Sequence, residues 1–510
     1  MELFSGTVPL TLGLFGGFVT LLYMYGRRRQ RLLKDAGIPG PEPNIIFGSL
    51  LTLLKKGIDF ENKKGKQYGD VFGEWLGGIP MITVFDPDIL KEVLIKDFQT
   101  FTDRLGFDLN DYPLTTNLFN AKIATWKRLR KITSPTFSAG KLKKMCGGLN
   151  LCAQKLTKNF VHAAESGEVV DLKQYFGAFT MDAIGNTGFG IDIDSQNDFD
   201  NSFVRETKKV FDNAFLANPV VFFIMLFPEL TPLAKMLGVS AFPKSTKKFF
   251  TQAVTEMIKE RRDEPREERE RRVDFLELML NAEDDGGHED GAKILDEATK
   301  KSANTLTTDE VIGQAFVFFL AGYETTASTL QYIAYILATQ PGVQDKLAEE
   351  ISSVLGNNEP DYDNIHGLVY MDHVINETLR LYPVVPGINR YVSKTTTIKG
   401  WTFPEGALIN IPIVVMHRNP EVYPEPKKFK PERWEKTSEI NPMHYQPFGH
   451  GPRQCIGMRL ALIEVKVALI HLMRKIQFVR LEDTPDELTE FVVTGVFAPK
   501  KPLKLKVQLR

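Results

Sequence analysis

Hydrophobic and polar positions along the chain predict a few long helices and several short strands. Residues 458–473 repeat apolar positions at helical spacing, so we expect a helix there. A second long helix is expected from the capping box at residues 307–310 to Thr339, where Pro341 stops it. The β-branched and aromatic runs are shorter, and we expect extended segments at residues 81–85, 407–413 and 492–497.

The N-terminal stretch carries no charge between residues 3 and 25. Its apolar part, residues 8–25, is about long enough for a helix to cross the hydrocarbon core of a bilayer. Five basic side chains follow at once: Arg27, Arg28, Arg29, Arg31 and Lys34. Because positive flanks stay cytosolic, we expect a single-pass anchor in residues 1–26, with the rest of the chain facing the cytosol. A cleaved secretion signal is the alternative, but it would carry its positive charge before the apolar run.

A stiff connection follows the anchor. Residues 39–43 read Pro-Gly-Pro-Glu-Pro and cannot continue a helix. We therefore expect a basic patch and proline hinge at residues 27–45 and a body at residues 46–510. The chain has 510 residues, 43% of them hydrophobic, so it can bury a large core, and length alone suggests two or three domains. The formal net charge of -1 gives no indication of a nucleic-acid partner.

A turn-rich run, residues 448–457, places one cysteine just before a predicted helix. Gly449, Gly451 and Pro452 cannot propagate a helix, so the backbone turns and its N–H groups are free to surround the Cys455 sulfur. A thiolate at a helix N-terminus is stabilised by those donors and by the helix dipole. Such a sulfur is a good ligand for haem iron, where it favours O–O cleavage.

The chain has three cysteines, which is no disulfide framework and fits a reducing compartment. Cys146 and Cys152 lie in a helix-like segment, and we interpret them as packing residues. Cys455 could also be a buried structural cysteine. A zinc site made by Cys455, His444 and His450 is conceivable, although the spacing is a weak zinc signature.

The centre of the long helix that starts near residue 307 is unusual. Residues 321–326 place a glycine, an acid and two threonines inside an apolar run. A threonine hydroxyl can bond to the carbonyl four residues back, and we expect the helix to be interrupted there and to open a groove. Glu324 and Thr325 are suited to moving protons into such a groove. The alternative is a kinked core helix in which Glu324 faces solvent.

Two pairs of residues share helix faces. Trp126 and Arg130 stand four residues apart and could together bind a carboxylate. Their helix is basic, which indicates either a solvated face or a docking patch for an acidic electron donor. Glu377 and Arg380 stand three residues apart and could form an ion pair. Such pairs usually lie at the surface and contribute little.

The run Phe-x-x-Gly-x-Arg-x-Cys-x-Gly at 448–457 resembles the haem-binding loop of the cytochrome P450 superfamily. Ala-Gly-x-Glu-Thr-Thr, Glu-x-x-Arg and Pro-Glu-Arg motifs also occur, in the order that the family shows. The amino-acid sequence around these motifs is most similar to that of the clan of liver drug-oxidising and arthropod detoxification enzymes. The resemblance implies a mainly α fold with small β-sheets (α+β), a long central oxygen-binding helix and an N-terminal transmembrane helix. It also implies that residues 211–242 form a lid that often touches the membrane, although an ordinary core segment is equally compatible with the sequence.

The resemblance implies a monooxygenase in the endoplasmic reticulum membrane. It would insert one atom of O2 into lipophilic substrates such as xenobiotics, steroids or fatty acids. Haem b (iron protoporphyrin IX) would be the cofactor. Electrons would come from NADPH through cytochrome P450 reductase, with cytochrome b5 as a further partner. Two alternatives stay open: a reductase-independent isomerase or dehydratase of peroxides on the same fold, and a non-enzymatic, membrane-tethered haem carrier or sensor.

The family's site residues carry over by motif. Cys455 would be the axial ligand of the haem iron, and Glu324 and Thr325 would manage protons. The residues expected around the haem are Phe448, Trp126, Arg130, Arg390 and Arg453. A structural triad would consist of Glu377, Arg380 and Arg433. The expected substrate pocket comprises Phe107, Phe119, Leu320, Ala321, Val385, Val496 and Phe497. One departure from the family is Leu105 after Arg104, where relatives often carry a second basic residue, and it leaves one propionate contact in question.

Overall fold

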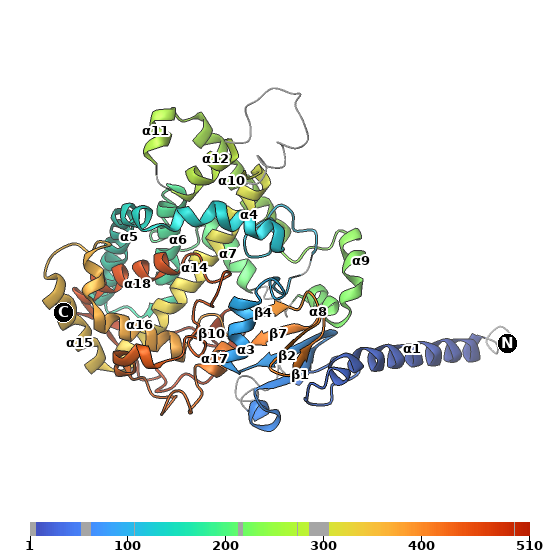
Figure 1. Cartoon of the computed structure of the whole chain (residues 1–510). Helices are drawn as coiled ribbons and strands as arrows, with labels where there is room; N and C mark the ends of the chain where they lie inside the picture. The colour runs from blue at the N-terminus through green and yellow to red at the C-terminus, as the bar shows by residue number, and fades with distance from the viewer. Residues whose placement is uncertain are drawn as a thin grey trace.

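The computed structural model describes residues 7–52, 63–106, 108–212, 218–272, 274–284, 305–493 and 495–510. The fold is a mainly helical body with several small sheets (Figure 1), as the resemblance implied. The helices are α1 (Thr7–Asp35), α3 (Pro87–Lys91), α4 (Ile123–Thr133), α5 (Ala139–Ser166), α6 (Leu172–Ile184), α7 (Ser202–Asp212), α8 (Pro219–Leu226), α9 (Thr231–Met236), α10 (Lys244–Asp263), α11 (Arg266–Arg271), α12 (Phe275–Asp284), α14 (Thr308–Thr339), α15 (Pro341–Leu355), α16 (Val369–Leu381), α17 (Ile413–Met416) and α18 (Met458–Met473).

The strands are short and come from distant parts of the chain. They are β1 (Val71–Leu76), β2 (Ile79–Val84), β3 (Val170–Asp171), β4 (Ile388–Tyr391), β5 (Thr396–Ile398), β6 (Trp401–Phe403), β7 (Leu408–Ile411), β8 (Ile476–Val479), β9 (Phe491–Val493), β10 (Phe497–Pro499) and β11 (Lys504–Leu509). The four-stranded sheet has the order β1-β2-β7-β4, in which β2 and β7 run parallel and the other neighbours antiparallel. This sheet therefore joins the first hundred residues to the segment around residue 400.

The local predictions agree with these elements. The capping box is present, because the Thr307 hydroxyl accepts from the Glu310 N–H and the Glu310 carboxylate accepts from the Thr307 N–H. The predicted helix at residues 458–473 matches α18. The three extended segments correspond to β2, β7 and the β9–β10 hairpin.

The long helix α14 is the centre of the core. Most of its side chains are buried, and it packs against α6, α10 and α18. Phe319 on α14 stacks on Phe189 with ring centroids 4.2 Å apart. Burying one such side chain stabilises a fold by about 1.5–3 kcal/mol. The expected interruption at residues 321–326 does not occur, because α14 is one continuous helix from Thr308 to Thr339.

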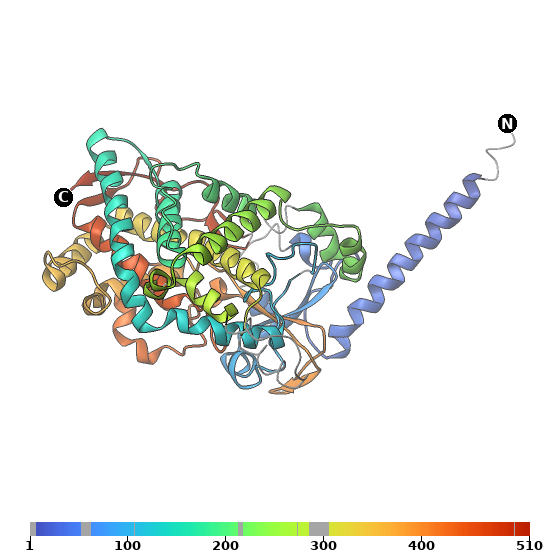
Figure 2. The ribbon, with the colours of Figure 1, turned by 90° about the horizontal axis from the view of Figure 1, so that it is seen from above.

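The N-terminal helix α1 projects away from the body (Figures 1 and 2). It is one helix from the apolar segment through the basic residues to Asp35. Residues 39–43 are non-helical, as predicted for the proline hinge. Among the residues described, no single helix passes a length and apolarity test for a membrane span, and the bent pair Pro219–Leu226 and Pro228–Met236 passes it by length and composition only.

Candidate functional site

A cavity of about 320 Å³ lies in the interior of the body. Its walls come from α14, α16, α18, strand β4 and the turn-rich loop that precedes α18. Most of the lining is apolar, including Leu379, Val384 and Val465. The sequence-predicted residues that line it are Phe119, Ala321, Thr325, Val385, Arg390, Phe448, Arg453 and Cys455.

The loop before α18 forms a compact turn around one cysteine. The Cys455 N–H donates to the Phe448 carbonyl over 2.9 Å. Gly449 and Gly451 have φ values of 69° and 77°, in the left-handed region that favours glycine. A Cβ at Gly451 would also collide with the carbonyl oxygen of Leu94. Glycine at this position is therefore what lets the loop pass close under the neighbouring segment.

The Cys455 side chain is exposed to this internal cavity and not to the outer surface. Burial raises the pKa of the Cys455 thiol. The N–H groups of Gly457 and Met458 and the charges of two arginines, Arg130 and Arg104, act in the opposite direction and lower it. The donors expected from the sequence are present, but the cost of burial outweighs them in the pKa of the free thiol.

Three guanidinium groups meet at one end of the cavity. Arg104, Arg390 and Arg453 all line it. Burial, followed by repulsion among them, lowers the pKa of Arg453 to about 10 and the pKa of Arg390 well below its usual value. Burial likewise lowers the pKa of Arg104 to about 10. Among the residues described, Nε of Arg390 and both Nε and Nη1 of Arg453 are buried with no hydrogen-bond partner.

These arginines have little protein charge to balance them. Among the residues described, Arg453 forms an ion pair with Asp103 over 3.6 Å. Arg104 donates to the Arg453 carbonyl over 3.0 Å, and Arg453 donates to the Ala121 carbonyl over 2.6 Å. Buried cationic donors without partners are costly, so this end of the cavity fits a ligand with carboxylate groups.

Trp126 and Arg130 on α4 approach the same loop from outside the cavity lining. The indole of Trp126 is buried, and the Arg453 guanidinium lies 4.8 Å from its ring centroid. Arg130 donates to the Gln454 carbonyl over 3.0 Å. The predicted pair therefore contacts the two residues that precede Cys455.

The centre of α14 faces the cavity with Ala321 and Thr325. The Thr325 hydroxyl donates to the Ala321 carbonyl over 2.7 Å, which is the bond expected for a threonine within a helix. Glu324 is not in the cavity lining. It is 4% exposed, and Lys173 on α6 lies 3.2 Å from its carboxylate. Burial raises the pKa of Glu324, while the charge of Lys173 opposes that rise.

Four of the residues expected in the pocket are placed elsewhere or not described. Phe107 lies outside the described residues. Leu320 and Val496 are partly buried against the main core and do not line the cavity. Phe497 is fully buried, and its ring stacks on Phe491 with centroids 4.1 Å apart. The Phe497 N–H also donates to the Val384 carbonyl over 2.8 Å. Phe497 therefore belongs to the core beside Val384.

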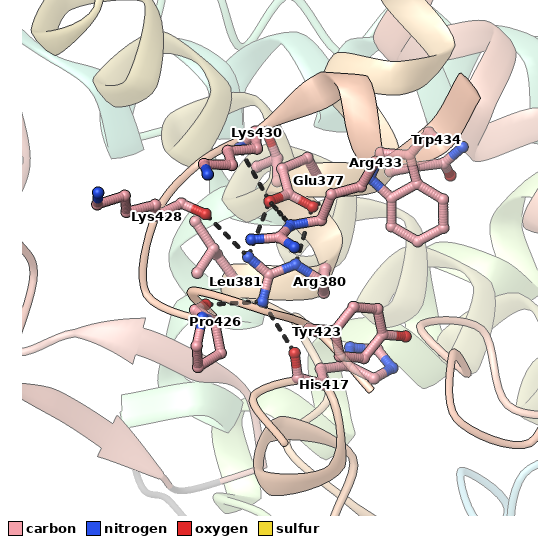
Figure 3. Close-up of polar contacts among 12 residues, drawn as sticks. Glu377, Arg380, Leu381, His417, Tyr423, Pro426, Lys428, Lys430, Arg433 and Trp434 are labelled. Carbon is pink, nitrogen blue, oxygen red and sulfur yellow. Dashed lines mark hydrogen bonds and ion pairs between the residues drawn. The ribbon is translucent and has the colours of Figure 1, made fainter. Parts of the chain in front are cut away.

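The triad residues meet as expected in a buried network (Figure 3). Arg380 makes two bonds of 2.8 Å to the Glu377 carboxylate, and Arg433 donates to the same carboxylate over 3.1 Å. The indole of Trp434 adds a bond of 3.0 Å. Glu377 and Arg380 are both fully buried.

A histidine connects this network to the cysteine loop. The Arg380 guanidinium donates to the His417 carbonyl over 2.9 Å. The His417 Nε2 accepts from the Gln446 N–H over 2.9 Å. Burial lowers the pKa of His417 to about 3, so the ring is neutral and can accept this bond. The network therefore fixes the residues that lead to Phe448.

Sequence reasoning did not assign three of the charged residues near the site. Arg104 supplies a guanidinium at the cavity next to the unusual Leu105, whose N–H donates to Asn389 over 2.7 Å. Lys173 pairs with Glu324 from another helix. Glu464 on α18 is buried, and burial raises its pKa well above its usual value, against the effect of a hydrogen bond with Thr326. None of these residues belongs to a local motif that would have indicated its role.

Comparison with known proteins shows the class of this chain. The cytochrome P450 family profile, described as "Cytochrome P450", matches residues 38–507. The chain belongs to the cytochrome P450 family, and it is a haem-containing monooxygenase. Over 99% of its length it is 39% identical to cytochrome P450 3A29 of Sus scrofa, covering 98% of that relative. It is 38% identical to cytochrome P450 3A5 of Homo sapiens over all of its length and 99% of the relative. It is therefore a P450 monooxygenase that is similar to those of the 3A type.

Proposed function

We propose that this chain is a membrane-anchored haem-thiolate monooxygenase that hydroxylates lipophilic molecules with electrons from an NADPH-dependent P450 reductase. The observation that carries this proposal is the cavity that Cys455, Thr325 and three buried arginines share. Haem b, when bound, supplies an iron at which O2 is activated. The chain positions the haem, transfers protons to it and provides a pocket for the substrate from which water is excluded.

Cys455 would hold the haem iron through its sulfur. The N–H groups of Gly457 and Met458 point at the sulfur, and they would stabilise the thiolate in the ligated state. Gly451 and the Glu377–Arg380 network keep the loop in place below the cavity. A fixed loop prevents water and other side chains from competing for the sulfur's position.

The propionates of haem b would be bound by the arginines at one end of the cavity. Arg390 and Arg453 carry the unpaired donors that two carboxylates can satisfy. Arg104 would supply the cationic contact that Leu105 removes, because its guanidinium lines the same end. Trp126 and Arg130 would not contact the propionates themselves. They would position Arg453 and Gln454, which they contact.

Thr325 and Glu324 would deliver protons from neighbouring faces of α14. Thr325 lines the cavity, and because its hydroxyl proton is donated to the Ala321 carbonyl, its oxygen can accept a hydrogen bond there. Glu324 is buried, and burial raises its pKa, so its carboxyl holds a proton more readily than an exposed glutamate does. Lys173 is 39% exposed and connects this carboxylate to the protein surface.

The substrate would occupy the apolar part of the cavity. Phe119, Ala321 and Val385 line it together with Leu105 and Ile388. Such walls bind lipophilic molecules by burial and offer few polar groups to fix one orientation. We therefore propose a broad class of apolar substrates, such as xenobiotics, steroids or fatty acids.

We propose that residues 1–26 anchor the chain in the endoplasmic reticulum membrane and that residues 27–45 connect this anchor to a cytosolic catalytic domain, residues 46–510. The order of apolar and basic residues in α1 supports this topology. The exposed side chains of Lys122 and Lys127 beside the cysteine loop support docking of an acidic reductase, with cytochrome b5 as a second donor.

Turnover with a purified reductase tests this function. The full chain with P450 reductase and NADPH should oxidise a lipophilic probe, and omitting either the reductase or NADPH should stop the reaction. Rearrangement of a fatty-acid hydroperoxide without NADPH would instead support an isomerase or dehydratase. Haem binding without either reaction would support a carrier or sensor.

A further inference from the structure

A second cavity lies where the N-terminal helix meets the body. It has a volume of about 510 Å³ and lies apart from the cavity of Cys455. Its walls come from the end of α1, the turn between β1 and β2, and η4 (Pro228–Leu230), which follows α8. The residues with polar or aromatic tips in its lining are Tyr25, Arg28, Arg29, Trp75, Glu229 and Tyr391.

Arg29 is built into the wall of this cavity. Its guanidinium donates to the Leu226 carbonyl over 3.1 Å and also bonds to the Gly78 carbonyl. It lies 3.7 Å from the Glu229 carboxylate and 4.8 Å from the centroid of the Tyr25 ring. A Cβ at Gly78 would collide with this guanidinium, so the glycine provides the space for it. The arginine thereby joins α1 to the β1–β2 turn and to the end of α8.

The charge of this cavity is positive. Arg28 is exposed and lines the same space as Arg29, whereas Glu229 is the acidic residue in the lining. Two guanidiniums against one carboxylate leave an excess positive charge. The rest of the wall is apolar or aromatic, including Leu32, Ile79 and Pro80. A ligand that fits must carry a negative group at one end and tolerate apolar surroundings.

Exposed apolar side chains flank the cavity on two sides. Leu21 and Met24 on α1 are 67% and 61% exposed. Phe223 on α8 and Met236 on α9 are 50% and 76% exposed. Figure 2 shows α1 leaving the body on the side where the α8–α9 segment, in green, also lies. Acyl chains could therefore run along either face while a headgroup occupies the cavity.

We propose that this cavity binds the phosphate headgroup of an anionic phospholipid. This inference rests on the membrane anchor proposed above, because the anchor brings the cavity to the depth of the headgroups. Guanidiniums are strong donors to phosphate oxygens, and amphipathic rings such as those of Tyr25 and Trp75 suit the interface. Basic residues that directly follow a membrane helix on the cytosolic side attract anionic lipids.

Native mass spectrometry of the full chain in a neutral detergent tests the site, with phosphatidylglycerol as the probe. We expect one lipid to bind saturably. Arg28→Gln should weaken its binding by about fivefold or more, since one basic residue near anionic lipid contributes that much. Glu229→Gln should strengthen binding, because it removes the negative charge beside Arg29. Arg31→Gln is the matched control, because it removes the same charge from the same helix outside this cavity, and it should change binding by less than about twofold.

Equal effects of Arg28→Gln and Arg31→Gln would overturn the proposal, and so would weaker binding in Glu229→Gln. Competition with inorganic phosphate is the second experiment. If it displaces phosphatidylglycerol at equal concentration, the site recognises free phosphate and the lipid assignment is wrong. Binding to neutral phosphatidylcholine vesicles tests the anchor separately. If the wild type and Arg28→Gln both bind those vesicles and the lipid site is absent, the inference fails while the anchor stands.

Discussion

The ammonium group of Lys173 on α6 lies 3.2 Å from the carboxylate of Glu324, at the middle of α14. The lysine side chain is 39% exposed and the glutamate side chain 5%. One end of this ion pair is therefore open to water, and the other end lies one residue from the cavity-lining Thr325. The pair is therefore a polar connection between the protein surface and the centre of α14.

Replacing Lys173 with methionine should slow proton delivery. Burial raises the pKa of Glu324 and the charge of Lys173 opposes that rise, so the variant's carboxyl should keep its proton to higher pH. We expect product formation to fall by ~3–10-fold at neutral pH. In a plot of turnover against pH, the transition that reports the titration of Glu324 should shift to higher pH. Lys208→Met is the control, because Lys208 has a smaller effect on the same pKa. Identical pH profiles for all three proteins would argue against this route.

Removing the Thr325 hydroxyl should separate oxygen reduction from oxygen insertion. Thr325→Ala should still consume NADPH, but most of the oxygen should leave as hydrogen peroxide, with product yield lowered by about tenfold or more. Thr329→Ala is the matched control one turn further along α14. Its hydroxyl donates to the Thr325 carbonyl over 2.9 Å, and it also lines the cavity. The measurement is product and peroxide per NADPH, and equal yields in the two variants would contradict the role of Thr325.

Glu377→Gln should destabilise the protein strongly. It leaves the fully buried Arg380 without its charged partner, and breaking a buried ion pair in this way costs about 3–5 kcal/mol. The exposed pair of Glu432 and Lys346, with atoms 3.9 Å apart, offers a control. Glu432→Gln should change the free energy of unfolding by less than about 1 kcal/mol. Thermal unfolding and haem content measure both variants. A Glu377→Gln protein as stable as the control would show that the network is dispensable.

Glu464 should make the stability depend on pH. Burial raises its pKa well above the usual value, so the folded protein holds a proton that the unfolded chain has released. The stability contributed by this group is complete below the unfolded pKa and is lost as the pH rises toward the folded value. Glu464→Gln should therefore gain stability relative to wild type over the pH range that begins at the unfolded pKa and extends upward, by up to about 1.4 kcal/mol per pH unit.

Denaturant unfolding across that pH range checks the prediction. The exposed Glu349 on α15 provides the control, because Glu349→Gln should follow wild type at every pH. A difference between Glu464→Gln and wild type that stays constant with pH would mean that this carboxyl is not held protonated by the fold.

Much of the fold could be predicted because the signals are local. The capping box needs only Thr307 and Glu310, and the helical period of residues 458–473 is complete within α18. The ion pair of Glu377 with Arg380 also follows from helix spacing alone. In each case the residues that interact lie within one or two turns of each other.

The parts of the site that sequence reasoning missed depend on contacts between distant segments. Arg104 reaches the Arg453 carbonyl from a loop, and Lys173 reaches Glu324 from another helix. The position of Phe497 follows from stacking on Phe491 inside the hairpin, which turns the ring into the core. Periodicity carries no information about such pairings. The prediction that α14 is interrupted was wrong, because tertiary packing on both sides overrides the low helix propensity of glycine and threonine.

The central claim is that Cys455 holds the haem iron through its sulfur, and the absorption spectrum of the reduced protein with carbon monoxide tests it most directly. We predict the red-displaced Soret band of a thiolate ligand for the full chain. We predict its loss in Cys455→Ser, with Cys146→Ser and Cys152→Ser unchanged in spectrum. A wild-type protein without that band, or a Cys455→Ser protein that keeps it, would contradict the account.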